Sequence, residues 1–293
     1  MTLSHDPHWL RAGNWLSKDS SADFAIVGVG ASKTALTPNK SHETPTAIRE
    51  SLLRYSTWSS SAKIDLVDSL KGSDFGDVNK PDDQEATSTE LARLLDNTKT
   101  LVLIGGDNSI TYSGVIALSK KFAIDEIGLI TLDAHHDLRD GKSNGSPIKQ
   151  LVDAGLPGRN IVQIGINDFA NSKFYAQRAI ELGISIIHRQ SFESLSIKEI
   201  ASQALKSLTH CKVIYLDIDV DVCDRSVVPA APASMPGGIS ANQLRLLVSN
   251  IAQDNKVTTF DITEIDSTID APDQRTVRLA ALLILEIAIA KAK

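Results

Sequence analysis

Cysteines and aromatic residues are scarce in this sequence. Only Cys211 and Cys223 occur among its 293 residues, and aromatic residues make up 5% of the chain. Two cysteines exclude a fold held together by several disulfides, and in an acidic chain they are more typical of a reducing cytoplasm. The sequence alone does not decide between two free thiols and one disulfide. We expect a cytoplasmic protein stabilised by its hydrophobic core.

An excess of basic residues and long hydrophobic runs are also absent. The formal net charge is −6. Nucleic-acid binding requires a basic face, so no nucleic-acid partner is expected. The most apolar stretch, Leu279–Ala290, contains Glu286 and is too short to cross a membrane. Met1–Trp15 lacks the basic start and apolar continuation of a secretion signal, so we expect neither membrane insertion nor export.

Hydrophobic residues make up 42% of the chain, enough for one large core. Apolar, β-branched runs predict strands over Ala25–Val29, Leu101–Ile104, Ile127–Leu132, Ile161–Ile166, Ile184–Ile187, Val213–Leu216 and Val257–Ile262. Helical patterns lie between them near Pro45–Tyr55, Ile110–Lys121, Ile148–Ala154, Lys173–Leu182, Ile197–Leu208, Ala241–Asp254 and Asp273–Lys291. This alternation predicts an α/β fold: a single three-layer α/β/α domain over residues 1–293 with a mostly parallel sheet.

One polar stretch interrupts the alternation. Residues Ser69–Ser88 are rich in Gly and Asp and contain few apolar side chains. We expect a surface loop there. The strand and helix patterns resume soon afterwards, so the stretch is not interpreted as a linker between domains.

Polar segments follow four of the predicted strands. They are Gly105–Asn108, Asp133–Asp137, Asp217–Asp224 and Asp261–Asp266. Because ligands of parallel sheets bind beyond the carboxyl ends of the strands, we expect these segments to converge. Buried carboxylates are costly to desolvate, and a set of Asp with one His suits Mn, Mg or Ca. The pattern indicates a hydrolase whose metal ions activate water.

The order and spacing of these segments resemble the ureohydrolase superfamily, also called the arginase family. Asp133-Ala-His135-x-Asp137 is similar to its DAHxD segment, and Asp219-x-Asp221-x-x-Asp224 to its DxDxxD segment. Glu264-Ile-Asp266 is similar to the late loop that contains a glutamate. The resemblance covers nearly the whole chain and implies an arginase-like fold.

The resemblance also implies a site with two Mn²⁺ ions. Its ligands would be Asn108, Asp133, His135, Asp137, Asp219 and Asp221, with Asp133 and Asp219 shared between the ions. Asp137 would carry a proton from water to the leaving nitrogen, and Glu264 would hold the cationic =NH₂ group of the substrate. Relatives of this family are commonly homo-oligomers, so we expect one here.

Three departures from the family pattern bear on the substrate. Asn108 stands where a His ligand is usual, so this side should hold its ion less tightly. Asn144 stands where arginases have a His that shuttles protons. Arg139 stands where arginase has a neutral residue, and its guanidinium can pair with a carboxylate. These residues are similar to those of bacterial formimidoylglutamases and favour N-formimino-L-glutamate, hydrolysed to L-glutamate and formamide in histidine degradation.

Two alternatives stay open at this point. Another guanidino-acid hydrolase would keep the metal chemistry but release urea, and a catalytically silent binding protein would keep only the fold. Among the remaining polar residues, His136 is interpreted mainly as structural and Cys223 as a buried neutral thiol, while Arg225 has no assigned role. Asp217 either supports a ligand or bonds to the backbone. Gly105 and Gly106 are interpreted as a tight turn with positive φ.

Overall fold

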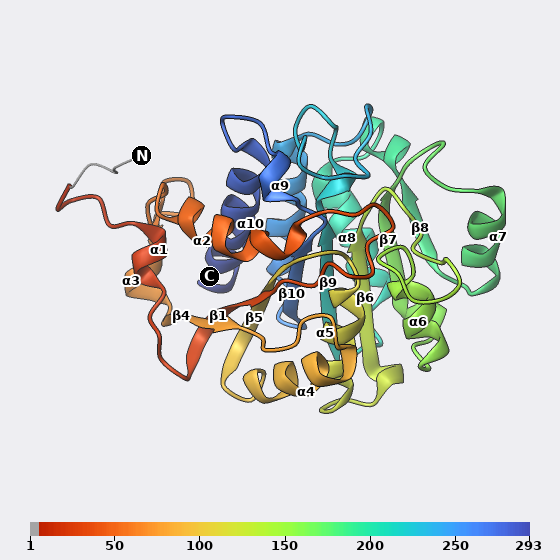
Figure 1. Cartoon of the computed structure of the whole chain (residues 1–293), viewed down its shortest axis with the longest axis horizontal. Coiled ribbons are helices and arrows are strands. Elements are labelled where there is room, and N and C mark those ends of the chain that lie inside the picture. The colour runs from red at the N-terminus through yellow and green to blue at the C-terminus, as the bar shows by residue number, and fades with distance from the viewer. Residues whose placement is uncertain (1–5) are drawn as a thin grey trace.

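The computed structural model describes residues 6–293, so the first five residues of the expected domain lie outside the described range. Eight strands form one parallel sheet in the order β4-β1-β5-β10-β9-β6-β7-β8. A short antiparallel hairpin, β2 with β3, lies apart from it. Figure 1 shows the sheet crossing the molecule between β4 and β8, with helices on both sides.

The bounds of the elements follow the predicted alternation of strands and helices. The strands are β1 (Ala22–Val29), β2 (Trp58–Ser59), β3 (Ile64–Asp65), β4 (Gly72–Asp77), β5 (Thr98–Gly105), β6 (Ile127–Leu132), β7 (Ile161–Ile166), β8 (Ser185–His188), β9 (Val213–Asp219) and β10 (Val257–Thr263). The helices are α1 (Ala12–Trp15), α2 (Thr44–Leu52), α3 (Leu66–Ser69), α4 (Gln84–Leu94), α5 (Ile110–Ser119), α6 (Pro147–Asp153), α7 (Lys173–Glu181), α8 (Ile197–Ser207), α9 (Ala241–Ala252) and α10 (Arg275–Lys291).

The predicted α/β class, the three layers and the mostly parallel sheet are confirmed. All predicted strands and helices are present, with ends shifted by a few residues. The predicted loop over Ser69–Ser88 is wrong, because it contains strand β4 and the first turn of α4. β4 pairs with β1 alone, so a polar edge sequence suffices there. Helix α4 buries Thr87, Ser88 and only one large apolar side chain, Leu91, which weakens its apolar pattern.

Helices cover the two faces of the sheet around separate core clusters. On one face, α2, α8, α9 and α10 bury their apolar side chains against Phe260, Ile262 and neighbouring strand residues. On the other face, α4, α5, α6 and α7 pack against Leu103, Leu129 and Tyr215. The strands are therefore covered on both faces, which explains their continuous hydrophobic runs.

Side-chain caps stabilise the start of several helices. At α9, Ser240 accepts a hydrogen bond from the Gln243 backbone N–H, and the Gln243 side chain accepts one from the Ser240 N–H. The same reciprocal box joins Ser196 and Glu199 at α8. Each box satisfies two backbone donors that the helix itself leaves unpaired. No helix within residues 6–293 combines the length and hydropathy that a membrane span requires.

The strand order determines which polar segments meet at one edge of the sheet. Strands β5, β10, β9 and β6 are consecutive neighbours in the sheet, although they are far apart in the sequence. The polar segments that follow these strands therefore meet at one edge, at the point where the chain returns from the outer strands to the middle of the sheet.

Candidate metal centre and active site

The loop after β6 turns its acidic side chains toward one point. The Asp133 backbone N–H still donates to the Ile164 carbonyl, so this residue extends the sheet. Its Oδ1 then accepts the His135 N–H at 2.6 Å, which tightens the turn. Asp137 has a positive φ of 52°, a conformation that Asp adopts more readily than most residues. Asp133 and Asp137 are both buried.

The end of β9 supplies the other half of the cluster. Asp219 Oδ1 accepts the Asp221 N–H at 2.9 Å, which starts a short turn of 3₁₀ helix. Asp221 Oδ2 lies 3.0 Å from His135 Nδ1, and Asp133 Oδ1 lies 3.4 Å from the same nitrogen. Ligand atoms of Asp133, His135 and Asp221 all lie within 4.8 Å of one another. These are suitable ligands for a divalent cation.

The electrostatics of the cluster favour a bound cation. Burial and the neighbouring Asp221 raise the pKa of Asp133 to about 6. Burial and nearby carboxylates also hold the pKa values of Asp137 and Asp219 well above the usual range. Asp221 raises the pKa of His135 to about 12. Neither Lys nor Arg forms an ion pair with these carboxylates among the described residues, so His135 is their one cationic side-chain partner.

Asn108 contacts this cluster through its amide nitrogen. Its Nδ2 donates to Asp137 Oδ2 at 2.6 Å. Its Oδ1 accepts hydrogen bonds from the hydroxyls of Thr111 at 2.8 Å and Thr263 at 3.2 Å. In this orientation the amide positions Asp137. Its predicted role as a metal ligand would require the amide to turn by half a rotation, so that the oxygen faces the carboxylates.

Glu264 reaches the cluster from the end of β10. It has a positive φ of 61°, and its Oε1 accepts the Asn108 N–H at 2.7 Å and the Asn144 Nδ2 at 2.9 Å. Burial raises the pKa of Glu264 to about 7, while the Asn144 hydrogen bond favours the ionised form. Asn144 also accepts the Leu36 N–H, so it joins two loops to Glu264. The two bonds at Oε1 leave Oε2 for another partner.

The turn after β5 depends on close backbone packing. Neither Gly105 nor Gly106 has positive φ, so that interpretation of the pair is wrong. A Cβ on Gly106 would lie 2.0 Å from the Ala31 carbonyl oxygen, and one on Gly105 would lie 2.4 Å from Ile110 Cδ1. Gly106 is needed because the chain after β1 passes directly over this turn, and Gly105 because the Ile110 side chain packs against it.

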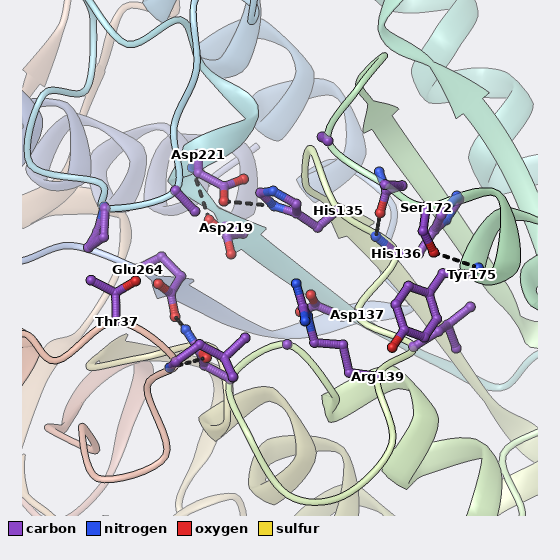
Figure 2. Close-up of a pocket in the computed structure, with 18 of the residues that line it drawn as sticks. Thr37, His135, His136, Asp137, Arg139, Ser172, Tyr175, Asp219, Asp221 and Glu264 are labelled. Carbon is purple, nitrogen blue, oxygen red and sulfur yellow. Dashed lines mark hydrogen bonds and ion pairs between the residues drawn. The ribbon is translucent and has the colours of Figure 1, made fainter.

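A cavity of about 420 Å³ opens over the cluster. Its floor contains His135, Asp137, Asp219, Asp221 and Glu264, and its wall contains Arg139 and Tyr175. Figure 2 shows Glu264 on one side of the cavity and Arg139 with Tyr175 on the other. Arg139 is exposed, and no described residue forms a hydrogen bond or ion pair with its guanidinium. The structure thus brings all the predicted site residues together, with Asn108 beneath Asp137.

A buried polar network beneath the cluster was not predicted as a unit. Asp217 and Asp261 face each other in register on β9 and β10. Thr111 Oγ1 lies 2.9 Å from Asp261 and 3.3 Å from Asp217, and Tyr215 donates to Asp261 at 2.7 Å. The Asp217 carboxylate therefore lies against Thr111, which holds Asn108, and no backbone group of residues 6–293 donates to it. Only the pairing of strands that are distant in sequence reveals this.

The other polar residues singled out in the sequence bond to neighbouring parts of the fold or are buried in it. His136 pairs with Gln163 at 2.7 Å, and burial lowers its pKa. Arg225 donates to the carbonyls of Ala231 and Pro232, and so holds the loop that forms one rim of the cavity. Cys211 and Cys223 are free and buried, and burial raises the pKa of both thiols.

Comparison with known proteins supports the resemblance. A formimidoylglutamase of Halalkalibacterium halodurans is 33% identical, over 96% of this chain and 92% of its own. The crystal structure of the Bacillus subtilis formimidoylglutamase matches with a TM-score of 0.91 at 26% identity, covering 99% and 94% of the two chains. A formiminoglutamase of Trypanosoma cruzi with Mn²⁺ has the same fold, with a TM-score of 0.82 at 21% identity and coverage of 93% and 94%.

The family model described as the arginase family matches residues 22–290, which include every strand and every predicted site residue. The predicted arginase-like fold and the order of its acidic segments agree with this match. The chain therefore belongs to the arginase family.

Proposed function

We propose that this protein is a Mn²⁺-dependent hydrolase of N-formimino-L-glutamate, releasing L-glutamate and formamide. The observation that carries the proposal is the cavity, which has an acidic floor and one unpaired guanidinium, Arg139, on its wall. The floor suits metal ions and a cationic amidine, and the wall suits a carboxylate. Relatives at 32–33% identity bear the name formimidoylglutamase, which agrees with this chemistry.

The donor set fits Mn²⁺. Asp133, His135, Asp137, Asp219 and Asp221 offer carboxylate oxygens and an imidazole nitrogen, the ligands that manganese accepts in proteins. Burial and neighbouring carboxylates raise the pKa values of Asp133 and Asp219, so a bound cation would stabilise their ionised forms. The T. cruzi relative binds Mn²⁺. When bound, the metal lowers the pKa of water and so supplies a nucleophile near neutral pH. We propose two ions per chain, with the weaker at the Asn108 side.

Asp137 and Glu264 carry the steps that belong to the protein itself. We assign Asp137 to accept the proton of the attacking water and to pass it to the α-nitrogen of glutamate as the C–N bond breaks. Asn108 Nδ2 keeps this carboxylate in place at 2.6 Å. We assign Glu264 to hold the cationic nitrogen of the formimino group through Oε2, because Asn108 and Asn144 already occupy Oε1.

Arg139 and Asn144 account for substrate choice. A guanidinium in the cavity wall pairs with a carboxylate through two parallel hydrogen bonds. It would repel the cationic tail of agmatine. Asn144 has no proton to exchange near neutral pH, so its contribution is to hold Glu264. A homo-oligomer in the cytoplasm completes the proposal, in keeping with the family.

Product analysis tests the proposal. The protein would be loaded with Mn²⁺ and offered N-formimino-L-glutamate, arginine, agmatine and short guanidino acids separately, with assays for glutamate, formamide and urea. We expect glutamate and formamide from the first substrate alone. Urea from a guanidino acid would replace the proposed substrate, and no turnover with metal bound would favour a catalytically silent relative.

A further inference from the structure

The cavity is polarised along its length. The metal-side floor holds every carboxylate of the lining, whereas the opposite wall contains Arg139, Ala170, Asn171, Ser172 and Tyr175. Arg139 is the single Lys or Arg among the described residues that line the cavity. One guanidinium saturates one carboxylate. A substrate with two carboxylates therefore needs a second set of donors on the same wall.

Tyr175 presents such a donor. Its ring packs on the core cluster that contains Leu138 and Leu151, and stands edge-on to Phe174 at 5.5 Å between ring centroids. The residue is half-buried, and no described residue hydrogen-bonds to its hydroxyl. Figure 2 shows the side chain on the Arg139 side of the cavity. A half-buried ring with an unpaired hydroxyl toward a cavity is suited to a polar ligand.

Arg178 fixes Tyr175 and Arg139 relative to each other. It donates to the Leu138 carbonyl at 2.7 Å and to Asp140 Oδ1 at 2.8 Å, on both sides of Arg139 in the chain. Its guanidinium carbon also lies 4.7 Å from the Phe174 ring centroid and 5.7 Å from that of Tyr175. Helix α7 and the loop after β6 are thereby joined. The segments that carry the two donors are therefore held together before any ligand binds.

The loop beneath Arg139 is shaped to carry this side chain. A Cβ on Gly145 would lie 2.9 Å from Arg139 Cδ and 3.1 Å from its Nε. The absence of a side chain at Gly145 lets the Arg139 stem lie flat across the loop. The backbone N–H of Arg139 also donates to the Gly145 carbonyl. The guanidinium is thus directed along the wall on which Tyr175 lies.

We propose that Tyr175 is a specificity-determining residue whose hydroxyl donates to the side-chain carboxylate of a dicarboxylate ligand while Arg139 pairs with the α-carboxylate. This rests on the proposed function and adds a second anchoring point to it. The two donors select compounds with two carboxylates over compounds with one. Tyr175 contacts the substrate tail and takes no part in the proton transfers.

The test compares Tyr175→Phe with the parent enzyme, both loaded with Mn²⁺. A hydrogen bond to a charged group is worth enough to change affinity by about tenfold or more. We expect KM for N-formimino-L-glutamate to rise about tenfold with little change in kcat, and KM for N-formimino-L-alanine, which lacks the side-chain carboxylate, to change less than twofold. Equal changes for both compounds, or no change for either, would overturn the proposal.

Tyr112→Phe is the matched control, because this tyrosine is also half-buried but lies on α5 outside the cavity. It should leave both KM values unchanged. Calorimetric measurement of L-glutamate binding tests the anchoring role of Tyr175 separately from the proposed reaction. If no compound is turned over but Tyr175→Phe weakens glutamate binding about tenfold, the anchoring point stands and the proposed reaction fails. If turnover occurs and glutamate binds the parent and Tyr175→Phe equally, the proposed reaction stands and the anchoring point fails.

Discussion

At the scale of single residues, the site consists of carboxylates that the fold buries without enough positive charge. Asp219 illustrates this: it lies at the end of β9, and burial together with Asp221 and Asp133 raises its pKa. Such a group destabilises the metal-free protein when ionised but binds a metal ion well. Its effects on stability and on metal binding should therefore have opposite signs.

Asp219→Asn separates these two effects. The amide oxygen can still accept the Asp221 N–H, so the turn is kept while the charge is lost. We expect the melting temperature in chelator to rise by a few degrees, and Mn²⁺ affinity to fall at least a hundredfold with loss of activity. Metal analysis and thermal unfolding would measure both. Asp224→Asn, which alters a half-buried turn carboxylate nearby, should leave metal content unchanged. Full activity of Asp219→Asn would refute the assignment of this ligand.

Arg139 carries the prediction on substrate affinity. Removing the guanidinium by Arg139→Ala should raise KM for N-formimino-L-glutamate by about 10- to 100-fold, the range for lost bonds between charged groups. The kcat value should change much less, because Arg139 lies on the wall away from Glu264. Arg159→Ala, an exposed arginine outside the cavity, serves as the control in the same steady-state assay. An unchanged KM would remove the carboxylate pairing.

At the scale of elements, hydrophobic runs in the sequence predicted the buried strands and the polar segments that follow them. Strands covered on both faces, such as β6 and β9, have continuous apolar runs, and the residues just beyond them are local in sequence. β4 was missed because an edge strand can be polar. The Thr263 hydroxyl, which donates to Asn108, depends on the approach of a segment that is distant in the sequence. No local pattern encodes such approaches.

The turn after β5 gives a prediction at this scale. In Gly106→Ala the new methyl would meet the Ala31 carbonyl oxygen and backbone nitrogen, neither of which can move without shifting β1. We expect the free energy of unfolding to fall by about 1–3 kcal/mol, as for other overpacked sites. Denaturant titration measures this. In Gly128→Ala the nearest atoms belong to side chains at 3.1–3.3 Å, so a smaller loss is expected. Equal losses would show that backbone contact does not explain the glycine.

At the scale of the whole molecule, four neighbouring strands bring acidic groups to one edge of the sheet. Much of the rest of the fold pairs its carboxylates in the ordinary way; Asp74, for example, bonds to Arg49 and Lys18, which lower its pKa although burial opposes them. Ion pairs of that kind contribute their full stabilisation above the normal pKa of Asp, so their contribution no longer changes near neutral pH. The metal cluster has the opposite pH dependence, so it should dominate the change in stability between about pH 6.5 and 8.5.

The sign follows from the groups that hold protons longer in the folded state. Glu264 has a pKa of about 7, against 4.5 in the unfolded chain, and His135 has a pKa of about 12, against 6.5. Between pH 6.5 and 8.5 the folded protein binds more protons than the unfolded chain, so stability falls as pH rises. Two groups act in the other direction: His136, whose pKa is lowered, below about pH 6.5, and Lys291, whose pKa burial lowers to about 8, only at the upper end of the interval.

We therefore expect the melting temperature of the chelator-treated protein to fall by several degrees between pH 6.5 and 8.5. With saturating Mn²⁺ the fall should be smaller, because the ions stabilise the ionised carboxylates and bind more tightly as pH rises. Glu264→Gln should flatten the metal-free profile, since it removes one of the titrating groups. A metal-free melting temperature that rises across this interval would mean that the buried carboxylates are compensated by charges other than a metal ion.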